Sequence, residues 1–152
     1  MKKLLLALLA ALLAVALPAA AMERATPEDA EDLARTAAAY IKKNGRDKAF
    51  AAFNDKGSQF FKQDLYVFAY DLKGNCLALP TKPERVGKNW NDLKDPDGKF
   101  ILRDFIEVAK SKGTGWSHYK FDNPASGKVE PKVSFIIKID DYLIGVGAYE
   151  KK

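Results

Sequence analysis

The sequence predicts an α+β protein in which an antiparallel sheet of about five strands carries a long N-terminal helix on one face. Three observations support this fold class. Apolar residues recur at helical spacing early in the chain, alternating aromatic and β-branched residues follow, and the last third holds three strand-like segments joined by short turns. Connections that short join antiparallel neighbours, and the apolar face of a sheet needs a covering layer.

The first residues have the pattern of a secretory signal peptide. Lys2 and Lys3 precede an apolar run over residues 4–17, then Pro18 and three alanines that end at Ala21. The run is shorter than the roughly 20 apolar residues that a membrane-spanning helix needs. We therefore expect cleavage after Ala21, with residues 22–152 forming a single domain in the periplasm or outside the cell.

Composition excludes several classes of function. The chain has 25 Lys and Arg against 20 Asp and Glu. Loss of two lysines with the signal peptide would leave a net charge of +3, scattered along the chain, so we expect no nucleic-acid partner. With one cysteine, Cys76, and one histidine, His118, the sequence predicts no internal disulfide, no bound metal and no cofactor.

Two helices are predicted first. Thr26 can cap the first helix, Pro27 suits its first position, and Gly45 ends it after a basic last turn. Its apolar face repeats at helical spacing through Leu33, Ala34, Ala37, Ala38 and Ile41. A short second helix, capped near Asp47, follows with Phe50 and Phe53 on one face.

The remaining elements are strands and one helix. Residues 65–79 predict a hairpin that turns at Lys73-Gly74-Asn75. A loop then leads to an amphipathic helix that begins near Phe100 and stops at Gly113. Strands at 116–121, 132–139 and 142–149 complete the sheet.

Two motifs invite a chemical interpretation that their surroundings do not support. Ser117 and His118 are neighbours on a strand, so their side chains point to opposite faces and cannot act as a nucleophile and its base. We therefore expect no catalytic residue and no enzymatic activity. Asp95-Pro96-Asp97-Gly98 resembles part of a calcium loop, but Leu93 would occupy the first ligand position, which favours a simple turn.

The aromatic residues and one lysine are more informative. Tyr66, Phe68 and Tyr70 alternate on one face of a strand, and their phenolic hydroxyls need partners if they are buried. Lys132 begins the strand "KVSFIIKI". It either points outward at the strand end or points inward, where an anionic ligand and tyrosine hydroxyls would stabilise its charge.

Several segments together resemble the single Cache domains of type 2, which are extracytoplasmic sensor modules with a PAS-like sheet. These segments are "DLYVFAYDLKGNCLALP", "VGKNWNDLKDPDGKFI", "GTGWSHYKFDNPASGKVEPKVSFI" and "DDYLIGVGAY". The resemblance runs from about Ala30 to Tyr149. It implies a pocket between the sheet and the loop-helix segment in the middle of the fold, and several members of the family bind small carboxylates there.

The resemblance also implies the site. Tyr66 lies in the first-strand aromatic motif, Trp116 and Tyr119 in the Gly-Trp-x-x-Tyr motif, and Lys132 is the lysine after the turn. Many relatives carry histidine before the proline of the second strand, where this chain has Leu79, which puts the usual ligand of the family in question. The expected ligand-binding residues are Tyr66, Phe68, Tyr70, Leu79, Trp90, Trp116, Tyr119, Lys132 and Ser134.

Two hypotheses of function follow. In the first, the chain is a soluble exported module that binds a small organic anion, such as a C2–C4 carboxylate, and acts through a separate membrane sensor kinase or chemoreceptor. No apolar run of spanning length follows residue 21, which is why we expect a separate membrane partner. In the second, the pocket is vestigial and filled by side chains, and the chain is an interaction module, with a homodimer as one candidate assembly.

Overall fold

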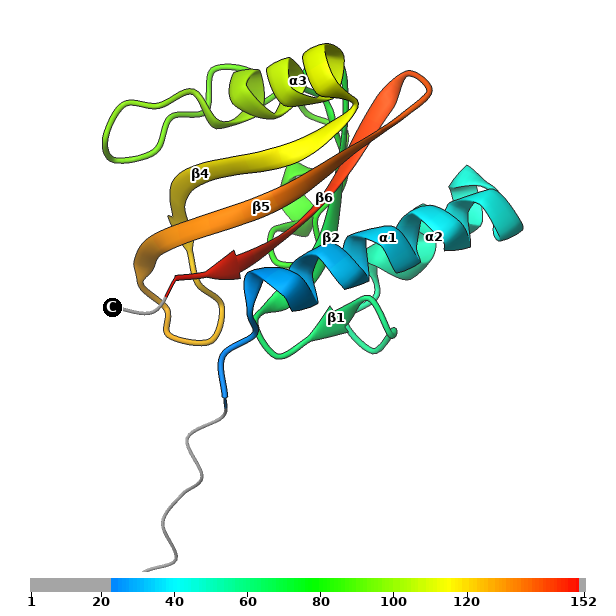
Figure 1. The fold of residues 1–152 in the computed structure, drawn as a ribbon, viewed down its shortest axis with the longest axis horizontal. Coiled ribbons are helices and arrows are strands. Elements are labelled where there is room, and N and C mark those ends of the chain that lie inside the picture. The colour runs from blue at the N-terminus through cyan, green and yellow to red at the C-terminus, as the bar shows by residue number, and fades with distance from the viewer. Residues whose placement is uncertain (1–22, 151–152) are drawn as a thin grey trace, which may run out of the picture.

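The structure is a computed structural model that describes residues 23–150, so the expected signal peptide at residues 1–21 lies outside the described residues. Within that range the helices are α1 (Pro27–Asn44), α2 (Arg46–Asn54), the 3₁₀ turn η1 (Pro83–Arg85) and α3 (Ile101–Lys112). The strands are β1 (Phe61–Lys62), β2 (Leu65–Asp71), β3 (Cys76–Ala78), β4 (Thr114–Asp122), β5 (Val129–Ile139) and β6 (Tyr142–Tyr149). Figure 1 shows their arrangement.

The predicted α+β fold is confirmed, with small differences at the ends of elements. Thr26 and Asp29 form a capping box at the start of α1, because the side chain of each accepts the backbone N–H of the other. α2 begins at Arg46 directly after Gly45, so Asp47 lies in its first turn and the expected cap near it is wrong. β1, a two-residue strand, joins the five predicted strands.

β5 is longer than predicted, and this changes the position of Lys132. The strand begins at Val129 and continues through Pro131, whose carbonyl accepts a hydrogen bond from the Glu150 amide at 2.9 Å. Lys120 pairs with Pro131 and Tyr119 with Lys132. Lys132 therefore lies inside a paired strand rather than at its exposed start.

The sheet is antiparallel, with the order β1-β2-β6-β5-β4 and with β3 paired to β2. The C-terminal strand β6 thus lies between β2 and β5. Gly145 on β6 is the partner of both Phe68 on β2 and Ile136 on β5. Because side chains alternate along each strand, this register assigns every strand residue to one of two faces.

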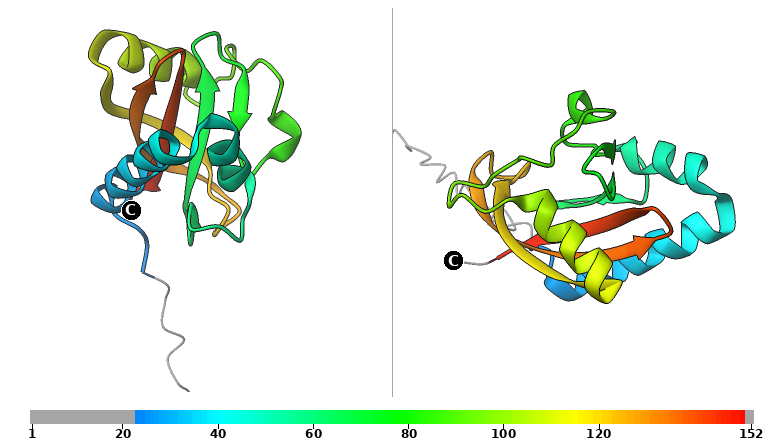
Figure 2. Two further views of the ribbon diagram at one scale, coloured as in Figure 1. Left: turned by 90° about the vertical axis from the view of Figure 1, so that its right-hand side faces the viewer. Right: turned by 90° about the horizontal axis from the view of Figure 1, so that it is seen from above.

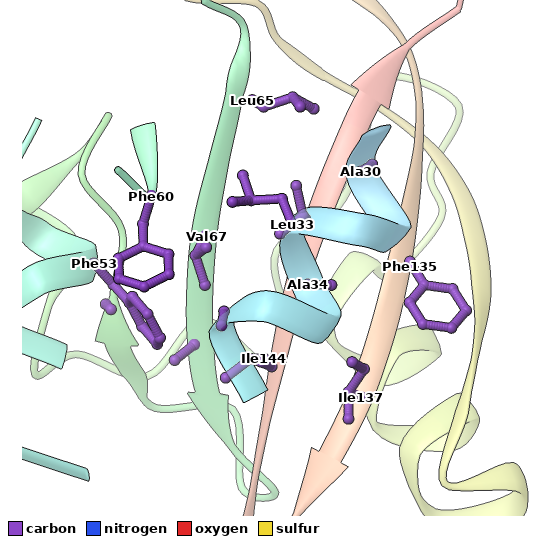
Figure 3. Close-up of a cluster of buried hydrophobic side chains, with 14 of the residues drawn as sticks. Ala30, Leu33, Ala34, Phe53, Phe60, Leu65, Val67, Phe135, Ile137 and Ile144 are labelled. Carbon is purple, nitrogen blue, oxygen red and sulfur yellow. The ribbon is translucent and has the colours of Figure 1, made fainter. Parts of the chain in front are cut away.

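One face packs against α1 and forms the larger core. Ala30, Leu33 and Ala34 of α1 lie over Val67 of β2 and Ile144 of β6, as Figure 3 shows. Small residues on the helix let it approach the sheet closely. Phe53 of α2 and Phe60 close one end of this core with their rings at right angles, 4.8 Å between centroids.

The opposite face packs against α3 and the segment that precedes it. The views in Figure 2 show α3 on the side of the sheet away from α1. Phe105 of α3 stacks on Phe68 of β2 at 5.3 Å and meets Tyr119 of β4 edge-on at 5.1 Å. The sheet therefore separates two cores, and the second is rich in hydroxyl-bearing aromatic residues.

Candidate ligand-binding site

A buried lysine lies in the core beneath α3. Lys132 is 1% exposed, and its Nζ donates a hydrogen bond to the Tyr66 hydroxyl at 2.8 Å. Three rings surround the ammonium, with centroids at 4.1 Å for Tyr66, 4.6 Å for Tyr149 and 5.6 Å for Phe121. Within residues 23–150 no carboxylate forms an ion pair with it. Ring faces and one hydroxyl stabilise the charge in part, but an unpaired buried cation remains costly.

Glycine on the central strand lets this lysine cross the sheet. Lys132 belongs to β5 and Tyr66 to β2, with β6 between them. A Cβ at Gly147 of β6 would overlap both Lys132 Cε and Ser134 Oγ. A Cβ at Gly145 would overlap the ring of Phe68 in the same way. Because Gly145 and Gly147 have no side chains, the Gly-x-Gly-x-Tyr segment of β6 leaves space in which side chains from β2 and β5 meet.

The lysine charge changes the acidity of the phenols around it. Burial opposes ionisation of Tyr66, but the positive charge of the Lys132 ammonium and the hydrogen bond that it donates outweigh burial and lower the pKa of Tyr66. The pKa of Tyr149 is instead raised, mainly by burial and also by the negative charge that Tyr66 would carry. Tyr66 is thus the phenol on which the charge of Lys132 acts through a direct hydrogen bond.

A second buried polar pair lies on the neighbouring strands. The hydroxyls of Tyr119 on β4 and Ser134 on β5 are 2.8 Å apart. Burial raises the pKa of Tyr119 well above its usual value, so this phenol stays protonated and can donate a hydrogen bond. The two polar pairs give the site one positive charge and several hydroxyl groups.

A small cavity lies between these groups and α3. Its volume is about 10 Å³, which is close to the space that one water molecule requires. Ten residues, mostly apolar or aromatic, line it: Tyr66, Phe68, Tyr70, Leu79, Leu93, Ile101, Leu102, Phe105, Tyr119 and Phe121. The side chains around the cavity must therefore move before a molecule of two or more carbons can enter.

The structure brings most of the expected site residues together. Tyr66, Phe68, Tyr70, Leu79 and Tyr119 line the cavity. Lys132 and Ser134 reach it through their hydrogen bonds to Tyr66 and Tyr119. Trp90 is half-buried and packs against the same core.

Trp116 lies elsewhere. It is 37% exposed, and its ring packs against Phe135, 4.9 Å between centroids, on the α1 face of the sheet. Tyr119, three positions along β4, is on the α3 face, because an odd spacing along a strand reverses the side. We therefore leave Trp116 out of the proposed site.

Sequence reasoning missed several cavity residues. Phe121 shares a face of β4 with Tyr119, and Phe105 is on the apolar side of α3, so alternation and helical spacing were usable signals. Thr81 and Arg85, which lie near the cavity without lining it, had no such signal. They belong to the irregular segment between β3 and α3, where no periodicity indicates which side chains point inward.

The two motifs first considered for chemistry have structural roles. Ser117 is buried and donates to Asp104, whereas His118 is exposed and lies 3.3 Å from Glu150 Oε1. Asp95 accepts backbone hydrogen bonds from Asp97, Lys99 and Lys120, which is how a turn is stabilised. Within the described residues, no cluster of His, Cys, Asp or Glu could hold a metal ion.

Comparison with solved structures first defines the fold, which is a PAS-like antiparallel sheet. A methyl-accepting chemotaxis protein from Vibrio parahaemolyticus has this fold, with a TM-score of 0.70, 22% identity and coverage of 80% of this chain and 86% of that one. So does the structure described as "Structural basis for carboxylic acid recognition by a Cache chemosensory domain". Its TM-score is 0.63 at 20% identity, with 82% and 88% of the chains covered.

The family follows from the sequence itself. The single Cache domain 2 family matches residues 5–152, so the chain belongs to that family. The sensor histidine kinase MctS of Rhizobium johnstonii is 37% identical over 91 residues, which are 59% of this chain and 20% of the kinase. The chain thus spans about a fifth of the length of this relative. Among the described residues, none of the helices has the length and apolar character to cross a bilayer.

Proposed function

We propose that this Cache domain is an exported sensory module that binds a small organic anion, of the C2–C4 carboxylate class, at Lys132. The single observation that carries the proposal is the buried ammonium without a carboxylate partner beneath α3. Cache sensory domains are ligand-binding modules without catalytic function, and we assign no catalytic role to any residue.

The chemistry of the site fits a carboxylate. Removal of a cation from water costs several kcal/mol unless an anion and hydrogen bonds compensate. A carboxylate beside Lys132 would supply the missing charge, and its second oxygen would accept a hydrogen bond from a protonated phenol such as Tyr119. The apolar side chains that line the cavity, among them Leu79 and Phe105, would surround the short carbon chain of the acid.

The relatives support a sensory role on the outer side of a membrane. MctS is a sensor histidine kinase, and the Vibrio protein is a chemotaxis receptor. We propose that residues 1–21 are a signal peptide, that residues 22–152 are the periplasmic domain, and that its bound state is read by a membrane sensor kinase or chemoreceptor. A neighbour of the same fold that recognises carboxylic acids supports the class of ligand.

Calorimetric titration tests the proposal. Acetate, propionate, butyrate and pyruvate are titrated into the purified protein, into Lys132→Ala and into Lys138→Ala, which removes an exposed lysine from the same strand. At least one acid should bind to the protein and to the Lys138 variant and lose at least tenfold in affinity in the Lys132 variant. If the Lys132→Ala variant binds the acids with unchanged affinity, the ligand-binding site lies elsewhere.

The nearly filled cavity favours a second candidate function. With about 10 Å³ of space, the cavity beneath α3 has room for about one water molecule and for no organic ligand. In that alternative the pocket is vestigial, and the domain is an interaction module that pairs with a second copy or with a membrane partner. Light scattering and the same titrations separate the two, because a module of this kind would self-associate or bind a partner while none of the acids produced heat.

A further inference from the structure

Two buried polar atoms without partners lie in the segment between β3 and α3. They are Thr81 Oγ1 and Arg85 Nη1, and they are the buried side-chain nitrogen and oxygen atoms of the described chain that make no hydrogen bond. Buried polar groups are rarely left unpaired, because a buried group that loses its hydrogen bonds to water without gaining others destabilises the fold. A buried guanidinium nitrogen without a partner points to a ligand that would supply the missing hydrogen bond.

Packing holds the arginine in place. Its guanidinium lies 4.5 Å from the centroid of the Trp90 ring, and its carbonyl accepts the Trp90 indole N–H at 3.1 Å. The contact with the Trp90 ring therefore positions a guanidinium whose Nη1 has no hydrogen-bond partner. The arginine also acts on the pocket wall: burial and Cys76 raise the pKa of Tyr70, and the charge of Arg85 opposes them.

Arg85 and Lys132 lie close to the same aromatic ring. The Phe121 centroid is 5.8 Å from Arg85 Cζ and 5.6 Å from Lys132 Nζ. The two cationic atoms are therefore at most 11.4 Å apart. A four-carbon diacid with a hydrogen bond of about 2.8 Å at each end bridges a gap of this order.

Lys132 and Arg85 lie next to two different spaces, an inner cavity and a surface groove. Lys132 lies beside the inner cavity, whereas Arg85 lines an adjoining groove of about 370 Å³ at the surface. Leu93, Ile101 and Phe121 are walls of both spaces. A molecule with one end in the inner cavity and the other in this groove would therefore lie against these three side chains.

The other charged groups of the groove are already engaged. Lys120 pairs with Asp97 at 2.8 Å, and Asp122 pairs with Lys82 at 2.8 Å. The Asp95 carboxylate accepts backbone N–H groups, and Lys94 lies over the Phe100 ring at 4.4 Å. Arg85 is thus the cation of the groove with a buried, unpartnered nitrogen.

We propose that Arg85 forms a second anion subsite and that the ligand is a short dicarboxylate. One carboxylate pairs with Lys132 in the inner cavity and the other with Arg85 in the outer groove. The inference rests on the proposed function, because it needs the inner carboxylate site, and it adds an acidic group at the other end of the ligand. Arginine suits this role because its planar fork can bind both oxygens of a carboxylate.

Succinate and succinamate test the inference, since succinamate replaces one carboxylate with a neutral amide of the same size. Calorimetry should show that the unmodified protein binds succinate at least tenfold more tightly than succinamate. In Arg85→Gln, succinate should weaken to the level of succinamate, while succinamate affinity stays within twofold. Arg46→Gln is the matched control, because Arg46 also stacks on rings, those of Phe50 and Tyr142, but on the other face of the sheet.

Three results would overturn the subsite. They are equal affinity for the two probes in the unmodified protein, a succinate preference that survives in Arg85→Gln, and equal weakening of both probes in that variant. The first comparison needs no variant and so does not depend on the folding of Arg85→Gln. If acetate or propionate binds through Lys132 while succinate gains nothing, only the second subsite is wrong. If none of these acids binds, the proposed function fails with it.

Discussion

Lys132 reaches Tyr66 because Gly147 has no side chain. The lysine on β5 and the tyrosine on β2 are two strands apart, and the path of the lysine side chain passes over the glycine of β6 that lies between them. The position of the Lys132 charge in the proposed site therefore depends on the absence of a Cβ atom at Gly147 on β6.

Gly147→Ala should displace the lysine. The new methyl group would overlap Lys132 Cε and Ser134 Oγ, and overpacking of this kind costs about 1–3 kcal/mol of stability. We expect a lower free energy of unfolding in urea and a loss of carboxylate binding. A double-mutant cycle provides the control, because the cost should shrink in a Lys132→Ala, Ser134→Ala background. An identical cost in both backgrounds would show that the overlap is not the cause.

Lys132→Met should separate stability from binding. Methionine keeps much of the length of the side chain and removes the buried charge, whose transfer from water costs several kcal/mol in the folded protein. We expect an unchanged or higher melting temperature together with the loss of any shift that carboxylates induce. Lys138→Met, at an exposed position of the same strand, should alter neither property. A strongly destabilised Lys132→Met would mean that the charge supports the fold rather than a ligand.

Asp95 should contribute to stability in a manner that depends on pH. Burial opposes its ionisation, but hydrogen bonds from the backbone of Lys99, Lys120 and Asp97 outweigh it and lower the pKa of Asp95. A lowered pKa in the folded state stabilises the protein above the unfolded value near 3.9, and this contribution is lost as the pH falls through the folded value.

The measurement is urea unfolding of Asp95→Asn between pH 3 and pH 7. The variant should be less stable by about 1–3 kcal/mol at pH 7, and the difference should diminish towards pH 3. Asp97→Asn, which removes an exposed carboxylate of the same loop, should have little effect throughout. A deficit in Asp95→Asn that is as large at pH 3 as at pH 7 would contradict the assigned role of the charge.

Cys76 should be chemically inert in the folded protein. The thiol is buried in the core beneath α3, and burial raises its pKa to about 11. Since the thiolate is the reactive form, alkylation by iodoacetamide at pH 8 should be roughly 100-fold slower than for a free thiol. Protein unfolded in urea, where the thiol is accessible, is the control. Rapid labelling of the folded protein would show that this core opens readily.

Elements with a local signal could be predicted from the sequence. The capping box at Thr26 and the small-residue face of α1 are local patterns, and alternation placed Tyr66, Phe68 and Tyr70 together. Trp116 was assigned by its motif, although strand parity puts it opposite Tyr119. The motif records which residues occur together, whereas the pleat decides which side each one faces.

Other features depend on contacts that no short window contains. The inward position of Lys132 has two causes, which are the extension of β5 through Pro131 and the absence of a side chain at Gly147. Gly147 is far from Lys132 in the sequence and becomes its neighbour only because β5 pairs with β6. The burial of Thr81 Oγ1 and Arg85 Nη1 depends on how an irregular segment packs against the rest of the chain. Long-range packing of this kind has no periodicity, so it becomes visible only in the folded chain.

A crystal structure of the protein grown with propionate tests the central claim most directly. We predict a carboxylate oxygen within about 3 Å of Lys132 Nζ, a second oxygen close to a tyrosine hydroxyl, and α3 or the segment before it displaced to enlarge the cavity. A cavity still filled by its own side chains, with the Lys132–Tyr66 hydrogen bond unchanged and propionate absent or bound elsewhere, would contradict the proposed site.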